Sequence, residues 1–268
     1  MPKQSSQWFI PIVLAIAAAA ALWYYWTRVS EPEPRPVPPP PAAVAEEPAA
    51  APGPLHPLER ADAGPAAERN LVPLPPLDES DAYFKLEIGN VFGATIDDLL
   101  AESGMIQRVV ATVDNLPRDR VTELIRPLGR IGGQFMVDGQ DGSGEYTINP
   151  DNYRRYDALV ELADNADLAE VADMYRRFYP LFQRAYVDLG YPDGYFNDRL
   201  VEVIDHLLET PEISDPVVLV RPHVLYEYRD AYLEALSGGQ KLLLRMGSEH
   251  AATIKRRLAE LRTLITTM

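Results

Sequence analysis

Cysteine is absent from this 268-residue chain, and basic residues are scarce. The lack of cysteine excludes disulfides, thiolate zinc sites, iron–sulfur clusters, a cysteine nucleophile and a lipid-modified cysteine anchor. Lys and Arg number 25 against 40 Asp and Glu, which gives a formal net charge of −15. Because nucleic acids and anionic lipid headgroups are held by clustered cations, this balance argues against both as partners.

Charge is also missing from a long run near the N-terminus. The 19 residues from Trp8 to Trp26 include no charged side chain, and a helix of that length rises about 28 Å, close to the thickness of a bilayer core. Trp and Tyr side chains flank the run, as is usual at membrane interfaces. The sequence therefore predicts a transmembrane helix over residues 8–27, after a short cytoplasmic head at residues 1–7. A cleaved signal peptide is the alternative, but the alanines lie in the middle of the run rather than before a cleavage site.

Proline is in excess, with 15 of the 25 prolines between Glu31 and Pro76, among Ala and Glu. Such a segment cannot bury enough apolar surface to offset its ordering entropy. We therefore predict a disordered spacer over residues 28–76, with the alternative that its prolines are a ligand for aromatic-lined grooves. Glu31, Glu33 and the long spacer are poor signals for cytoplasmic retention. We therefore expect the N-terminus in the cytoplasm and the C-terminal part on the opposite side of the membrane.

Periodic apolar patterns begin near Leu77 and continue to the C-terminus. Helical spacing is strongest over residues 167–189, where apolar residues recur every three or four positions. Pro180 lies inside that segment and predicts a kink near Arg176. Helices are expected at residues 82–93, 95–100, 105–115, from 150 onward, 167–189, 195–209, 242–246 and 248–265. The chain thus predicts a mainly α fold in which one helical module, residues 77–268, follows the transmembrane helix and the spacer.

Two stretches of the module carry β-strand signals instead. Residues 133–148 place a Gly- and Asp-rich turn between two short strand-like runs, which predicts a small β-hairpin. The acidic residues of that turn lack the spacing of a calcium-binding EF-hand, so ordinary turn chemistry is expected. Short β-like runs also occur at residues 217–220 and 224–228, where the intervening Pro222 predicts an edge strand or a bend.

Part of the module resembles a known family. The resemblance lies in YRRFYPLFQRAYVDLGYPDGYFNDRLVEVIDHLLETP (Tyr175–Pro211) and in QKLLLRMG (Gln240–Gly247). These segments are similar to a bacterial domain-of-unknown-function family, number 3014 (DUF3014), and the earlier ESDAYF and VATVDNLPR extend the resemblance over most of the module. The resemblance implies an uncharacterised, membrane-anchored single-pass protein of the bacterial envelope with a Pro-rich spacer. Together with the orientation expected above, this places the anchor in the bacterial inner membrane and the C-terminal domain in the periplasm. The family has no assigned activity or site residues, so the resemblance implies none here.

Four carboxylates follow one face of the expected helix 195–209, namely Asp198, Glu202, Asp205 and Glu209. A metal ion or an acid–base pair could use such a stripe. A solvated helix face, neutralised by arginines of the preceding helix, explains the stripe equally well and is the favoured interpretation because exposed ion pairs are common. The expected partners are Arg176, Arg177 and Arg184.

The histidines are isolated in the sequence. His206, His223 and His250 have no second histidine at a metal-ligand spacing, and His56 lies in the spacer without a ligand partner. We therefore expect structural or exposed roles for them, and we assign no metal, cofactor or catalytic residue. The tripeptide Gly238-Gly239-Gln240 matches that of peptide-release factors by letters alone, and we dismiss that role in an acidic, membrane-tethered chain.

The turn between the helices 167–189 and 195–209 is rich in aromatic residues. Rings grouped around a Pro-Asp-Gly turn can form a rigid docking patch, because they offer a large contact area at low entropy cost. They can also be a plug that closes the corner between the helices. The candidate protein-binding residues of this turn are Tyr191, Asp193, Tyr195 and Phe196.

These observations favour a protein that is not an enzyme. We expect the Trp8–Trp26 helix to anchor it in the membrane and the helical module to bind another envelope protein as a scaffold, while no small-molecule ligand is assigned. The alternative is a cell-wall hydrolase that uses acidic residues of the helix 198–209. The two hypotheses predict different surfaces. An enzyme needs a deep pocket with convergent carboxylates, whereas a docking module needs an exposed apolar patch.

Overall fold

The computed structural model describes residues 53–58, 73–129, 132–139, 144–214 and 216–267. The predicted transmembrane segment 8–27 and most of the predicted spacer 28–76 lie outside these ranges. Within the described ranges, no helix combines the length and the hydropathy that a membrane crossing requires.

The described residues form a mainly helical module, as predicted. They contain nine α-helices, three short 3-10 helices and four strands. The α-helices are α2 (Asp81–Phe92), α3 (Met105–Asn115), α4 (Asp151–Arg154), α5 (Asp157–Asn165), α6 (Leu168–Asp188), α7 (Phe196–Leu208), α8 (Ala231–Glu234), α9 (Gly238–Arg245) and α10 (Ser248–Thr266). The 3-10 helices are η1 (Leu77–Glu79), η2 (Ala94–Leu99) and η3 (Glu123–Ile125).

Local capping chemistry explains several helix starts. The Asp167 side chain accepts the backbone N–H groups of Ala169 and Glu170 at the start of α6, which satisfies donors that have no partner inside the helix. Ser237 and Gln240 form a reciprocal capping box at the start of α9. The helix expected from Pro150 onward is confirmed at its start, since α4 begins at Asp151, and a short break separates α4 from α5.

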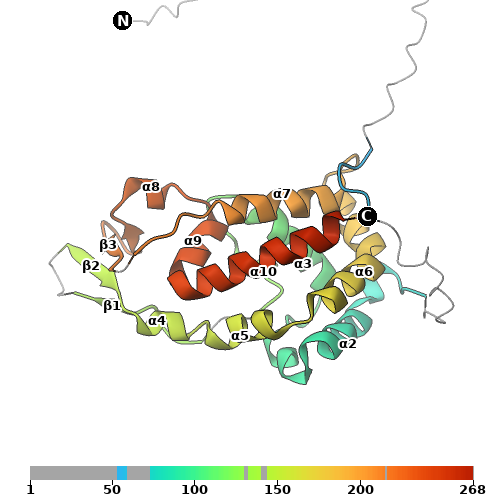
Figure 1. The fold of residues 1–268 in the computed structure, drawn as a ribbon, viewed down its shortest axis with the longest axis horizontal. Coiled ribbons are helices and arrows are strands. Elements are labelled where there is room, and N and C mark those ends of the chain that lie inside the picture. The colour runs from blue at the N-terminus through green and yellow to red at the C-terminus, as the bar shows by residue number, and fades with distance from the viewer. Residues whose placement is uncertain (1–52, 59–72, 130–131, 140–143, 215, 268) are drawn as a thin grey trace, which may run out of the picture. The chain divides into compact units, whose positions relative to one another are not determined.

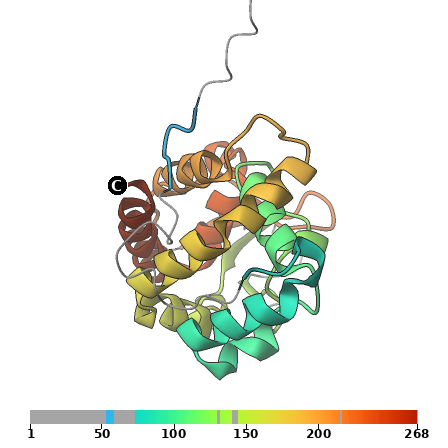
Figure 2. The ribbon, with the colours of Figure 1, turned by 90° about the vertical axis from the view of Figure 1, so that its right-hand side faces the viewer.

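Helix α6 lies at the centre of the main core. It contacts α2, α3, α7 and α10, and Figure 2 shows it crossing between them. Its Phe178 is fully buried and lies 4.9 Å, centroid to centroid, from Phe84 of α2. Its Phe182 stacks on Phe196 of α7 at 5.7 Å. The helix continues through Pro180 from Leu168 to Asp188, because the packing around it compensates for the one hydrogen bond that Pro removes.

The strands form one antiparallel sheet rather than an isolated hairpin. Strands β1 (Val137–Asp138), β2 (Glu145–Ile148), β3 (Val218–Val220) and β4 (Glu227–Tyr228) are paired in that order. The predicted hairpin is β1–β2, and β2 also pairs with β3 through the register Tyr146↔Leu219. Pro222 lies in a bend between β3 and β4, which is one of the two alternatives predicted for it, and β3 itself is a central strand of the sheet. The sheet and α8 lie at one end of the helical body and α2 lies at the other (Figure 1).

The tripeptide Gly238-Gly239-Gln240 has a structural role in this fold. The N–H of Gly239 donates to the carbonyl oxygen of Leu116 at 2.9 Å, which joins the start of α9 to the end of α3. A Cβ added at Gly239 would lie 2.8 Å from Leu207 Cδ2 and 2.9 Å from the same Leu116 oxygen. The lack of a side chain at Gly239 is therefore what allows α3, α7 and α9 to approach one another.

Candidate functional site

The aromatic turn before α7 is held rigidly against α6. Gln183 donates from Nε2 to the carbonyl oxygen of Gly194 at 2.7 Å and accepts the N–H of Phe196 at 2.9 Å. Phe196 is 1% exposed and packs in the main core. Its burial favours the plug interpretation for this residue, because a fully buried ring offers no surface to another protein.

The other candidate residues of the turn have different environments. Tyr191 is half-buried and stacks on Tyr186, with ring centroids 4.6 Å apart. Asp193 is exposed and Tyr195 is half-buried. Protein binding through Tyr191, Asp193 and Tyr195 thus stays a prediction, and it involves only the outer surface of the turn.

A buried carboxylate fixes the inner side of the turn. The side chain of Asp114, at the end of α3, is 3% exposed. Its oxygens accept from Arg199 Nε at 3.1 Å, from Arg118 Nη2 at 2.7 Å and from the Tyr191 hydroxyl at 3.2 Å. A buried carboxylate needs such partners to offset its lost hydration. The turn, α3 and α7 are therefore joined through one charged group.

The first turn of α7 also carries a buried amide, Asn197, which is 0% exposed. Its Oδ1 accepts the Tyr175 hydroxyl at 3.1 Å, and its Nδ2 donates to the carbonyl oxygen of Ile265 at 3.2 Å. The second Nδ2 hydrogen bond goes to the carbonyl oxygen of His56, at 2.8 Å. Burial, together with the nearby Tyr179 and Asp198, raises the pKa of the Tyr175 hydroxyl well above its ordinary value. Tyr175 is thus a neutral donor to Asn197.

Asp198, the next residue of α7, binds the same segment of chain. Its Oδ2 accepts the N–H of Leu55 at 2.9 Å, and its Oδ1 accepts the N–H of His56 at 2.7 Å. Leu58 packs against the main core. Gly53–Leu58, in the predicted spacer, is therefore held at the start of α7 (blue in Figure 1), near the end of α10. The composition of the spacer gave no signal of this contact.

The acidic stripe of α7 is neutralised differently from what the sequence predicts. Asp205 accepts from Arg262 of α10, at 2.5 Å from Nε and 2.9 Å from Nη2. Glu202 pairs with Arg199 at 2.8 Å, and Glu209 is exposed. The predicted partners Arg176, Arg177 and Arg184 instead pair with Asp173, Glu87 and Asp188. The prediction of those partners is wrong, because α10 rather than α6 supplies the cation that reaches Asp205.

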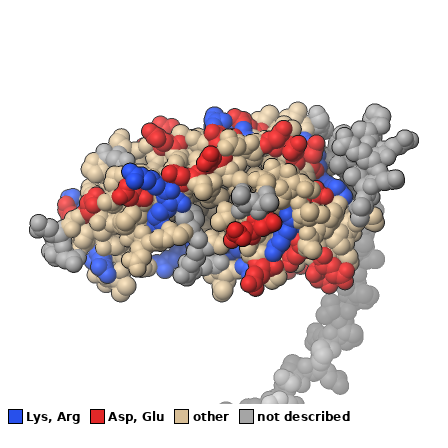
Figure 3. Space-filling view, turned by 90° about the horizontal axis from the view of Figure 1, so that it is seen from below, with Lys and Arg blue, Asp and Glu red and all other residues tan. Residues whose placement is uncertain are grey.

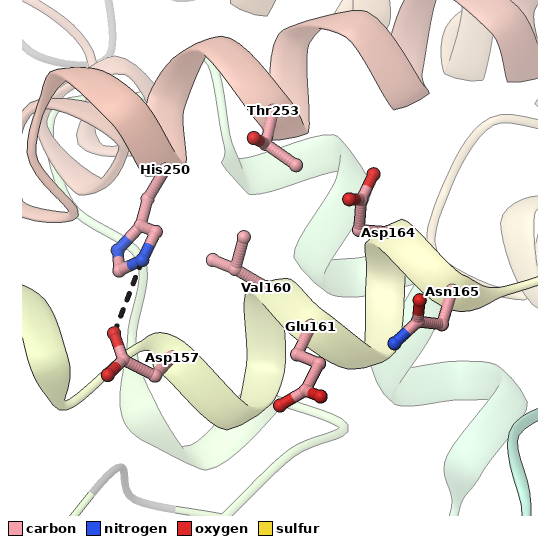
Figure 4. A pocket seen from close by; sticks show the side chains of 7 residues that line it. All are labelled: Asp157, Val160, Glu161, Asp164, Asn165, His250 and Thr253. Carbon is pink, nitrogen blue, oxygen red and sulfur yellow. Dashed lines mark ion pairs between the residues drawn. The ribbon is translucent and has the colours of Figure 1, made fainter.

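The acidic side chains of α5 and His250 of α10 line an open depression of about 360 Å³ (Figure 4). His250 Nε2 lies 3.2 Å from Asp157 Oδ1, and Nδ1 lies 3.0 Å from the carbonyl oxygen of Met246. Asp164 forms an ion pair with Arg256. Nowhere in the described ranges do three His, Asp or Glu side chains lie close enough to hold a metal ion. The spacing of residues in the sequence could not predict the Asp157–His250 pair, because its two residues lie on different helices.

The remaining histidines have simpler environments. His206 Nε2 lies 2.9 Å from the Ser237 hydroxyl, and the backbone carbonyl of His206 accepts from Gln240. His206 therefore supports the start of α9, in agreement with the structural role expected for it. His223 is exposed in the bend between β3 and β4.

An apolar surface lies at the free end of the sheet. The sheet-tip surface consists of Val224, Leu225 and Tyr226, in the connection between β3 and β4. Val224 is 76% exposed and Leu225 is 63% exposed. The rings of Phe135 and Tyr226 lie 6.0 Å apart, so the two chain segments meet here. Exposed apolar groups gathered in this way are typical of interaction sites.

The surface charge is mixed despite the acidic composition. On the face in Figure 3, acidic and basic side chains alternate over the module rather than forming one field of a single sign. At the sheet-tip surface, the guanidinium carbon of Arg221 lies 5.3 Å from the centroid of the Tyr226 ring, and Arg221 Nε donates to the carbonyl oxygen of Val224. An exposed cation therefore borders the apolar side chains.

Comparison with known proteins identifies the family of the chain. The family described as "Protein of unknown function (DUF3014)" matches residues 105–262. This match covers more than half of the chain, and the chain belongs to that family. No curated protein and no solved structure matches the chain.

Proposed function

We propose that this protein is an envelope scaffold that binds another protein and catalyses no reaction. In this proposal the helix 8–27 crosses the bacterial inner membrane once, and the module acts in the periplasm. The uncharged run from Trp8 to Trp26, with its flanking aromatic rings, supports the membrane anchor. The spacer supplies reach and raises the effective concentration of the module near its partner.

The observation that carries the proposal is the sheet-tip surface. Val224 and Leu225 expose large apolar side chains next to each other, and an exposed apolar pair gains free energy when a partner removes it from water. Arg221 beside them favours a partner protein that presents apolar side chains together with a carboxylate.

The hydrolase alternative has weaker support. Asp198, Glu202 and Asp205 have separate partners on different elements. The depression between α5 and α10 is open to solvent rather than deep. A pair of catalytic carboxylates has to converge on one bond of the substrate, and no observation favours such convergence here.

In-cell photo-crosslinking tests the proposal. A photoreactive amino acid is placed at Leu225 in the full-length chain, and a matched control is placed at Leu86, which is 60% exposed on α2 at the other end of the module. We expect one discrete adduct with an envelope protein from position 225 and none from position 86. A third position at Tyr195 tests the outer surface of the aromatic turn separately.

The partner is identified by mass spectrometry of the adduct. Replacing Val224 with Ser should reduce adduct formation from position 225 at least fivefold while the circular dichroism spectrum is unchanged. Equal adducts from positions 225 and 86, or an adduct only with a second copy of this chain, would contradict the proposal. Protease accessibility in spheroplasts measures the side of the membrane on which the module lies.

A further inference from the structure

We infer that the start of α7 is a peptide-binding site whose ligand is the chain's own segment Pro54–Leu58. We call this the latch site and define it by Asn197, Asp198 and the carbonyl oxygen of Ile265. The inference goes beyond the proposed function, because it concerns a surface at the start of α7 rather than the sheet-tip surface.

The latch site recognises the main chain of the segment. The two oxygens of Asp198 accept two successive N–H groups, those of Leu55 and His56. Asn197 donates to the carbonyl oxygen of His56, so both polar groups of the His56 backbone are bound. Carboxylate hydrogen bonds of this kind are stronger than those between neutral groups. Three hydrogen bonds to consecutive backbone groups fix the position and direction of the segment.

The side chains of the segment alternate between the module and solvent. His56 and Leu58 are half-buried, whereas Leu55 and Pro57 are exposed. Leu55 and His56 lie in a bend, which turns their two successive N–H groups toward the one Asp198 carboxylate. Pro54 and Pro57 restrict the unbound conformations of the segment, so less conformational entropy is lost on binding.

Asn197 is the evidence that this site is built for a ligand. It is fully buried, and its Oδ1 and one Nδ2 hydrogen bond are satisfied by Tyr175 and Ile265 of the module itself. The other Nδ2 hydrogen bond reaches only the segment, through His56. Because buried polar groups are almost always hydrogen-bonded, the segment completes the hydrogen bonding of Asn197, and its removal would leave this donor without a protein partner.

A spin label can report whether the segment is held. The chain has no cysteine, so Leu55→Cys gives a single labelling position, and Leu55 is 80% exposed, so the label replaces little contact surface. The experiment uses the full-length chain in detergent. Asp198→Ala removes the acceptor of both N–H groups, and Glu202→Ala is the matched control, since it removes a carboxylate one turn later on the same helix.

We expect a nitroxide at position 55 to be immobilised in the parent chain and in Glu202→Ala, and to become at least threefold more mobile in Asp198→Ala. Circular dichroism checks that both variants fold. Equal mobility in all three proteins would overturn the inference. So would mobility in the parent chain that rises on dilution, because the segment would then occupy the site of a second copy.

Peptide binding gives a second, independent measurement. The probe is a fluorescein-labelled peptide of residues 51–60, and the test protein is a vacated chain, the full-length chain in which Leu55 and His56 are both replaced by Pro, which removes the two N–H donors to Asp198. We expect binding to this vacated chain to be at least tenfold tighter than to the parent chain, and to be lost when Asp198→Ala is added. No binding to the vacated chain, or equal binding to both, would overturn the inference. Crosslinking from Leu225 is unaffected by either result, so the two proposals fail separately.

Discussion

Arg199 contacts Asp114 at two points. Arg199 Nε donates to the Asp114 carboxylate at 3.1 Å, and Arg199 Nη2 donates to the Asp114 backbone carbonyl at 3.0 Å. The Asp114 side chain is 3% exposed and that of Arg199 is 19% exposed. The pair therefore joins the end of α3 to α7 in an environment with little access to water.

Removing one member of this pair should be strongly destabilising. Arg199→Ala removes the less exposed of the two cations that pair with the buried Asp114 carboxylate, and we expect the free energy of unfolding to fall by about 3 kcal/mol. Arg118→Ala is the control, because Arg118 is 57% exposed and its removal leaves the Arg199 and Tyr191 contacts to Asp114 in place, so we expect a smaller loss. Urea unfolding followed by circular dichroism measures both. Similar losses for the two variants would show that the burial of Asp114 does not determine the effect.

Gly239→Ala should destabilise the module through a steric clash. The added Cβ would lie 2.8 Å from Leu207 Cδ2 and 2.9 Å from the Leu116 carbonyl oxygen, and overpacking of this kind costs about 1–3 kcal/mol. Gly132→Ala is the control, since no atom lies within 4 Å of a Cβ at that position. The melting temperature measures the effect, and an equal melting temperature for the two variants would contradict it.

Burial of Tyr175 predicts a loss of stability at alkaline pH. The raised pKa of Tyr175 means that its hydroxyl stays protonated in the folded chain at a pH where it ionises in the unfolded chain. Its contribution is therefore complete below the unfolded pKa of about 10 and decreases as pH rises above it, by up to about 1.4 kcal/mol per pH unit.

Tyr175→Phe should make this dependence less steep. The measurement is the free energy of unfolding from urea titrations between pH 9 and pH 11. Tyr232→Phe is the matched control, because Tyr232 is 62% exposed, and it should keep the steeper dependence of the parent chain. If Tyr175→Phe and the parent chain have the same slope, the prediction is wrong.

The helices were predictable where their signals are local. The expected helices 105–115, 167–189 and 195–209 agree with α3, α6 and α7 to within one residue at each end. Their apolar spacing, the cap at Asp167 and the Pro-Asp-Gly turn all act over a few residues. Such signals are present in the sequence before any tertiary contact forms.

Contacts between distant segments were not predictable in the same way. The pairing of β2 with β3 joins two hairpins that lie about 70 residues apart in the sequence. The hydrogen bonds from Leu55 and His56 to Asp198 join residues 143 and 142 positions apart. Composition describes the Pro-rich region only as an average, so it cannot indicate that a few of its residues fit a particular helix end.

The candidate site was predicted in part. The sequence identified the aromatic turn but left its plug and docking interpretations open, and the burial of Phe196 depends on the packing of α6 against α7. Val224 and Leu225 were predicted as part of a strand-like run. Pro222 places them instead in a bend, where their side chains face solvent.

The attachment of the chain at Leu55 and His56 has a mechanical consequence. A pull on the residues that precede Gly53 would reach the module first through Asp198, in the first turn of α7, and only afterwards through Pro73 and α2. Tension would therefore load α7 and the neighbouring end of α10 while η1 and α2 remained unstressed. The force at which the Asp198 contacts separate would set the tension at which load passes on to Pro73 and α2.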